Sequence, residues 1–183
     1  MSLETLTFSN KRLQEFFKIN PVVGGLTEWG APLGQLGRLI PAVIIKNLAK
    51  PCLWVRDSQD FEVYPSFWRD LGINLREVFF LYDEDPLKNL RTPLKSSEFE
   101  IIVLDLNRFI TPANMNYLAH YCRRQKVTCF LLRKYFLSPK NGNPFCRHRF
   151  NCSYSLQRDQ IQITAIKGQH KPLWLNMKEV VYG

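Results

Sequence analysis

The sequence lacks long apolar runs, regular cysteine spacing and internal repeats. Its longest uncharged apolar stretches, such as residues 39–45 and 101–104, fall far short of the roughly 20 residues that cross a bilayer, so we expect no membrane span. The N-terminus Met-Ser-Leu-Glu has no basic-then-apolar order typical of a secretory signal, which predicts a cytoplasmic protein. The five cysteines are odd in number and unevenly spaced, so we expect reduced thiols. The absence of a 20 to 50 residue period argues against a solenoid or propeller.

The composition is that of a globular protein. Of 183 residues, 45% are hydrophobic, 13% aromatic and 22% charged, which provides enough apolar surface for one core. No serine-rich or charged linker divides the chain. We therefore predict a single domain, comprising an N-terminal segment (1–21), an α/β core (22–137) and a basic loop with terminal strands (138–183).

Acidic residues are scarce in the second half of the chain. Residues 106–183 contain 13 Lys or Arg but only 2 Asp or Glu, whereas residues 1–105 contain 12 against 14. One part of the fold should therefore present a positive surface to an anionic partner, with nucleic acid as the first candidate. A solvated basic surface that only maintains solubility is the alternative.

Apolar strand-like runs alternate with helical stretches up to residue 137. This alternation predicts an α/β fold with a mainly parallel sheet flanked by helices. Beyond the turn-rich segment 138–144, three runs indicate terminal antiparallel strands. The predicted strands are 26–30, 52–55, 78–81, 99–106, 127–132, 148–156, 160–166 and 173–175, and the predicted helices are 39–49, 65–71 and 112–124, with a partly helical stretch over 84–97.

A glycine-rich loop follows the first predicted strand, where α/β folds hold phosphate on backbone amides and a helix N-terminus. Its glycines are Gly30, Gly34 and Gly37. A working phosphate loop needs Lys after the last glycine and then Ser or Thr for Mg²⁺, but this chain has Arg38 and Leu39. The loop therefore has the outline of the motif without its chemistry.

An apolar strand that ends in Asp105 matches the second part of such a site, the acid that helps to hold Mg²⁺, although apolar strands that end in Asp are common. With the glycine-rich loop, the strand at 52–55 and the Asn141-Gly-Asn143 loop, the chain resembles the RecA family over about residues 22–176. The resemblance implies a RecA-like, P-loop-type core in which Asp105 takes the Walker B position, and DNA bound near the loop before residue 148.

The departures from the family pattern concern catalysis. RecA ATPases carry a catalytic Glu shortly after the second strand, but residues 56–60 here offer only Asp57 and Asp60, with no Glu before Glu62. Because this Glu, the Lys and the Mg²⁺ hydroxyl are all missing, we expect no ATP hydrolysis and no cofactor. A surviving ATPase that uses Arg38 is the least favoured alternative.

A short RecA-like chain with a degenerate phosphate loop is similar to two bacterial proteins, the mutagenesis accessory protein ImuA and the cell-division inhibitor SulA. The resemblance implies a role in the SOS response to DNA damage that is exercised by binding. The ImuA-like interpretation implies an adaptor for a mutagenesis polymerase, with single-stranded DNA as a second candidate ligand. The SulA-like alternative implies a division protein as the partner and needs no DNA affinity.

Cations and aromatic rings are interleaved between residues 133 and 150, the mixture expected for single-strand binding. We expect Phe150 to belong to the core, whereas Phe136 and Phe145 could belong to either the core or the surface. Cys146, His148 and Cys152 lie near one another in sequence but lack the spacing of a zinc site, so no metal is expected. The candidate nucleic-acid or partner-binding residues are Arg133, Lys134, Lys140, Phe145, Arg147 and Arg149.

Leu13, Phe16, Phe17 and Ile19 form an apolar cluster at near-helical spacing in the N-terminal segment. RecA relatives commonly pair through such a segment, so a partner groove or a homo-oligomer is one interpretation. Packing against the chain's own sheet explains the cluster equally well.

Overall fold

The computed structural model describes residues 6–58, 65–89, 98–140, 142–168 and 171–182. Its strands are β1 (Leu26–Gly30), β2 (Cys52–Arg56), β3 (Val78–Tyr82), β4 (Ile101–Asp105), β5 (Thr128–Arg133), β6 (His148–Ser155), β7 (Gln160–Lys167) and β8 (Leu173–Asn176). Its helices are α1 (Lys11–Ile19), α2 (Leu39–Leu48), α3 (Pro65–Asp70), α4 (Pro86–Asn89), α6 (Pro112–Gln125) and α7 (Met177–Val181), with a 3₁₀ turn at Leu75–Glu77. The predicted stretch 84–97 is helical at α4, and residues 90–97 lie outside the described residues.

All eight strands form one sheet in the order β3-β2-β4-β5-β1-β6-β7-β8. The pairs from β3 to β6 are parallel, and β7 and β8 continue the sheet antiparallel. This confirms the predicted parallel core with a terminal antiparallel meander. Because the core strands are parallel, they share one carboxyl edge, where the glycine-rich loop lies, and one amino edge on the opposite side.

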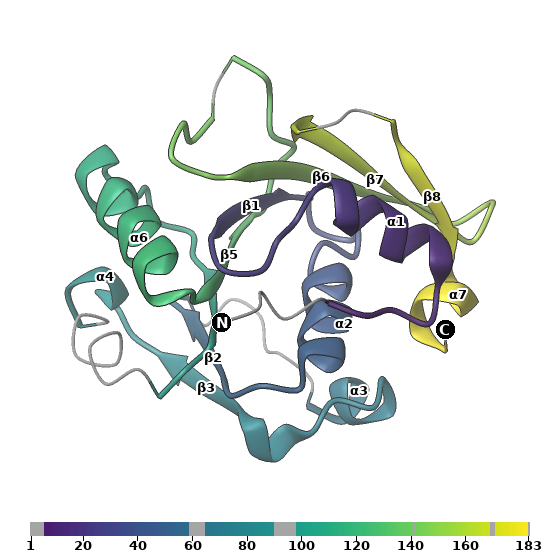
Figure 1. The fold of residues 1–183 in the computed structure, drawn as a ribbon, viewed down its shortest axis with the longest axis horizontal. Coiled ribbons are helices and arrows are strands. Elements are labelled where there is room, and N and C mark those ends of the chain that lie inside the picture. The colour runs from purple at the N-terminus through teal and green to yellow at the C-terminus, as the bar shows by residue number, and fades with distance from the viewer. Residues whose placement is uncertain (1–5, 59–64, 90–97, 141, 169–170, 183) are drawn as a thin grey trace.

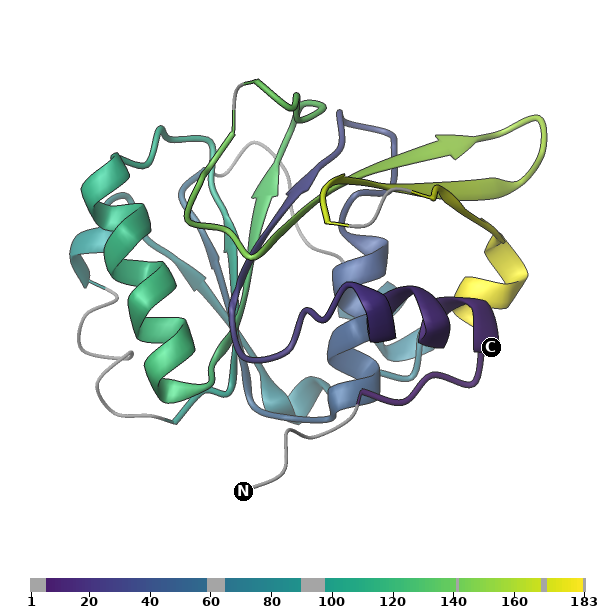
Figure 2. The same ribbon diagram turned by 45° about the horizontal axis from the view of Figure 1, so that its top comes forward.

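Helices cover both faces of the sheet (Figure 1, Figure 2). One face packs against α1 and α2. Trp29, Trp54 and Phe130 of the strands are fully buried in this layer. The other face packs against α6, which contributes Met115 and Leu118 to a separate apolar cluster. Burial on both faces explains why the central strands are nearly continuous apolar runs.

Helix α6 shows how local sequence sets the element bounds. Thr111 is its N-cap, and the threonine hydroxyl accepts a hydrogen bond from the backbone N–H of Asn114 at 3.3 Å. Pro112 follows at the first helical position, where its missing N–H removes no helical bond. The helix ends at Gln125, because the next residue, Lys126, has a left-handed φ of 59° that stops further helical bonding.

The N-terminal apolar cluster packs against the chain's own core. Phe16 contacts Phe150 with ring centroids 5.8 Å apart, and Phe17 contacts Trp29 at 6.2 Å. Only Ile19 points outward, with 54% of its surface exposed. Packing against the sheet is therefore the correct interpretation for the buried members of the cluster.

No helix among the described residues has the length and apolar character to cross a membrane.

Candidate functional site

The glycine-rich loop, residues 31–38, joins β1 to α2 at the carboxyl edge of the sheet. Gly34 has φ +83°, a conformation that favours glycine, and a Cβ on Gly37 would lie 2.3 Å from the Cβ of Ala31. The N–H of Gln35 donates to the carbonyl of Pro32, and the N–H of Leu39, the first residue of α2, donates to the carbonyl of Leu36. The loop is thus tightly folded on itself.

Arg38 and Asp105 form the central contact of this edge. Arg38 Nε donates to Asp105 Oδ2 at 2.6 Å, and its Nη2 donates to Oδ1 at 2.9 Å. The Asp105 side chain is 1% exposed and that of Arg38 is 31% exposed. The bidentate pair places a guanidinium on the carboxylate that the RecA resemblance predicts to face a nucleotide-bound Mg²⁺.

Asp57 follows β2, in the stretch where RecA ATPases carry a catalytic Glu. Its two carboxylate oxygens accept the backbone N–H groups of Asn107 and Arg108 at 2.8 and 2.9 Å. Asp57 therefore fastens the loop after β4 rather than facing the glycine-rich loop. The next two acids along the chain, Asp60 and Glu62, lie outside the described residues.

A hollow of about 280 Å³ lies beside the Arg38–Asp105 pair, and we call it the carboxyl-edge hollow. Its walls include the side chains of Leu33, Phe67 and Trp68. Leu33 and Phe67 are also exposed at the mouth, at 66% and 46%. The volume lies just below the roughly 300–1,000 Å³ typical of small-molecule pockets.

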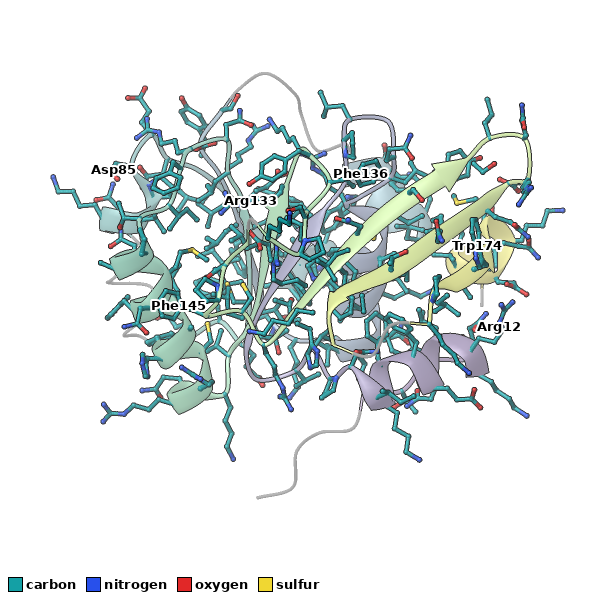
Figure 3. The ribbon with its side chains drawn as sticks, turned by 90° about the horizontal axis from the view of Figure 1, so that it is seen from above. Arg12, Asp85, Arg133, Phe136, Phe145 and Trp174 are labelled. Atoms are coloured by element: carbon teal, nitrogen blue, oxygen red, sulfur yellow. The ribbon has the colours of Figure 1, made fainter. Side chains whose placement is uncertain are left out.

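The predicted basic loop is divided between the two edges of the sheet. Because β5 and β6 both run parallel to β1, the connection 134–147 must return from the carboxyl edge to the amino edge, and it passes over the α6 side of the sheet (Figure 2). Arg133 and Lys134 therefore lie at the carboxyl edge, whereas Phe145 and Arg147 lie at the amino edge. Figure 3 shows Phe145 beside α6, well away from Phe136.

Of the predicted binding cations, Arg149 is buried and Arg133 is largely covered. Glu28, in the middle of β1, accepts Arg133 Nε at 3.1 Å and Arg149 Nε at 3.0 Å. Arg149 Nη2 also donates to the carbonyl of Ser138, and only 5% of its side chain is exposed. The expectation that Arg149 lies in an accessible basic loop is therefore wrong, because the arginine neutralises a buried carboxylate.

Arg133 is 11% exposed on its side chain and has the same partner. The N–H of Asn143 completes the cluster at 3.4 Å from Glu28 Oε2. Of the remaining candidates, Lys140 and Arg147 are exposed, while Lys134 and Phe145 are partly buried. The sequence signal that was missed is Glu28 itself, a charge within an apolar strand that requires a buried counterion.

The aromatic residues of the same segment also separate. Phe150 is 0% exposed, as expected of a core residue, and its ring contacts that of Trp29 at a tilt of 37°, with the centroids 4.5 Å apart. Phe136 is 48% exposed and Tyr135 is 55% exposed. Phe145 packs against the α6 cluster.

All five cysteines are buried and free. Burial raises the pKa of the Cys152 thiol to about 12. Cys146 packs in the α6 cluster and Cys152 in the cluster of the opposite face, so the two thiols lie on different sides of the sheet. Within the described residues no group of three or more His, Cys, Asp or Glu side chains has metal-binding geometry.

Comparison with known proteins identifies a structural relative. No protein-family model matches the chain, and no curated protein matches its sequence. The crystal structure of the RadB recombinase superposes with a TM-score of 0.75 at 11% sequence identity, covering 96% of this chain and 97% of the RadB chain. At this identity the likeness concerns the fold alone. The sheet order and this superposition agree with the predicted class, and the chain has a RecA-like α/β fold.

Proposed function

We propose that this chain is a RecA-fold binding protein of the DNA-damage response that does not hydrolyse ATP, acting as an adaptor in the manner of ImuA. The observation that carries the proposal is the bidentate Arg38–Asp105 pair. In this pair, the cation at the end of the glycine-rich loop and the acid at the end of β4 are bound to each other. The fold supports a role near DNA because the superposed RadB protein is a recombinase.

The residues at the carboxyl edge do not fit a magnesium nucleotide. Leu39 offers no oxygen to the metal where Ser or Thr is needed, and Asp105 is already covered by a guanidinium. Pro32 has no N–H to donate to a phosphate. We therefore derive no hydrolytic step for this site.

A protein partner has a suitable surface at β3, which is the first strand in the sheet order and pairs only with β2 among the described strands. Phe79 and Phe80 of this strand are 51% and 41% exposed, and Tyr82 is 39% exposed. Edge strands with exposed aromatic residues favour pairing with another chain. A partner polymerase, a division protein or a second copy of the chain could all use this surface, so the partner's identity stays a prediction.

ATP turnover by the purified protein tests the proposal. The wild-type protein and its Asp105→Asn variant are assayed for phosphate release with Mg²⁺, with and without single-stranded DNA. We expect the two rates to be equal, because contaminating enzymes ignore the substitution. A wild-type rate of ordinary ATPase size that the substitution abolishes would overturn the proposal.

A further inference from the structure

A second hollow, of about 420 Å³, lies at the amino edge of the sheet, opposite the glycine-rich loop. We call it the amino-edge hollow. Three cations from three elements line it: Arg123 in the last turn of α6, Arg147 just before β6, and Lys167 at the end of β7. Phe145 forms part of its wall. Strand pairing brings two of the cations together. Lys167 lies opposite Arg149 in the β6–β7 register, so it is beside the start of β6, where Arg147 lies.

Main-chain carbonyl groups hold these cations in place. Arg123 Nε donates to the Ala119 carbonyl at 3.2 Å, and Arg147 Nη1 donates to that of Val23 at 3.5 Å. Lys167 Nζ donates to the carbonyls of Pro144 and Cys146 at 2.9 and 2.7 Å. Such bonds position the charges without neutralising them.

Within the described ranges, no carboxylate lies within 4 Å of the three cations. Each side chain also has more N–H donors than these bonds use, since a lysine carries three and an arginine five. The three positive charges therefore gather around one hollow with donors left for an anion. This differs from Arg133 and Arg149, whose charges are opposed by Glu28.

The charges of Arg147 and Lys167 also act on the neighbouring His148. Burial first, and then the charge of Arg147, lowers the pKa of this imidazole below its usual 6.5. The backbone bond to Lys167 opposes this shift and the Lys167 ammonium adds to it. The His148 ring itself stacks on Phe150 and is not among the residues that line the hollow.

We propose that the amino-edge hollow holds the phosphate backbone of single-stranded nucleic acid. Three cations that converge on one hollow match the compact charge of a phosphate, whereas the carboxylates of an acidic peptide are spread along its length. Phe145 and Pro144 give the wall an apolar face for a sugar or base. The exposed Arg124 and Lys126, next to Arg123, extend the positive surface for neighbouring phosphates.

The proposal supplies the DNA contact that the proposed function leaves open, and rests on that function only for the choice of nucleic acid. It places the contact on the amino edge, whereas the sequence placed it in a continuous loop that includes Arg133 and Arg149. ATP turnover and DNA affinity are measured separately, so each proposal fails on its own assay.

The test is fluorescence anisotropy of labelled single-stranded DNA with the full chain over a salt series. The variant is Arg123→Gln with Arg147→Gln, which leaves Lys167 and its loop contacts intact. The matched control is Arg12→Gln with Arg158→Gln, which removes the same charge from exposed positions elsewhere. Thermal unfolding shows that both variants are folded before binding is measured.

We expect the control to retain the wild-type salt slope. The hollow variant should lose affinity, and the slope of log K against log salt should fall by about 1.4, because each single-strand phosphate contact contributes about 0.7. Inorganic phosphate should compete with the DNA for the hollow of the wild-type protein. The hollow variant should not show this competition. Equal losses in both variants, or no wild-type binding at low salt, would overturn the proposal.

An oligoglutamate peptide labelled in the same way distinguishes the alternative partner. If the hollow variant loses peptide binding while its DNA binding is unchanged, the hollow is a protein-docking site and the proposal is wrong. Weak peptide binding that is equal in all proteins, beside the DNA loss described above, supports it.

Discussion

Removing Arg38 should cost far more stability than removing the charge of its partner. The Asp105 side chain is 1% exposed at the end of the central strand β4, so Arg38→Ala leaves a buried carboxylate without its counterion. Breaking such a pair costs about 3–5 kcal/mol when the remaining charge stays dry. The adjoining carboxyl-edge hollow admits water, so we expect about 2–4 kcal/mol.

The reverse change is predicted to be mild. Arg38 is 31% exposed and reaches solvent, so Asp105→Asn should cost about 1 kcal/mol or less. The double variant should be more stable than Arg38→Ala alone, because the buried charge is then absent. Urea unfolding of the three variants, with the exposed Arg12→Ala as control, measures these differences. A cost for Arg38→Ala no larger than that of Arg12→Ala would refute the reasoning.

Three further outcomes follow from the described contacts. Gly142→Ala should destabilise the protein by about 3 kcal/mol, because a Cβ there would lie 1.7 Å from Arg149 Cζ and would displace the buried guanidinium. Gly34→Ala should cost about 1–2 kcal/mol in the same urea experiment, because a Cβ at Gly34 meets open space and only the positive φ is unfavourable. The free energy of unfolding should fall between pH 7 and 5.5, and His148→Gln should reduce this fall. The pKa of His148 is below 6.5 in the folded state, so the unfolded chain binds the proton more readily as the pH falls. An identical pH profile in the variant would contradict this sign. A thiol reagent at pH 8 should leave the five buried cysteines unmodified in the native protein and react with all five in denaturant, and rapid native labelling would show that the thiols are accessible.

Sequence patterns predicted the sheet well because its strands are buried on both faces. The runs at β2, β4 and β5 contain almost no polar residue, and the glycine and proline residues of the intervening loops mark their ends. The tight loop after β1 was also predictable, since Gly34 has a positive φ and Gly37 leaves no room for a Cβ, and the sequence displays both glycines directly.

The pairings within the site depended on long-range contacts that no spacing reveals. Arg38 and Asp105 are 67 positions apart, and Glu28 is 121 positions from Arg149. The basic segment is continuous along the chain. However, it connects two strands that both run parallel to β1, so its beginning and its end lie at opposite ends of the strands. The amino-edge hollow combines Arg147 with α6 and β7, so it could not be found from one segment.

Calorimetric titration of MgATP into the wild-type protein and into Asp105→Asn tests the central claim most directly. If Arg38 and Asp105 are engaged with each other, neither protein should show binding heat that depends on Mg²⁺. Magnesium-dependent binding of ATP by the wild-type protein that the Asp105 variant loses would contradict the account, since the carboxylate would then be available to the metal.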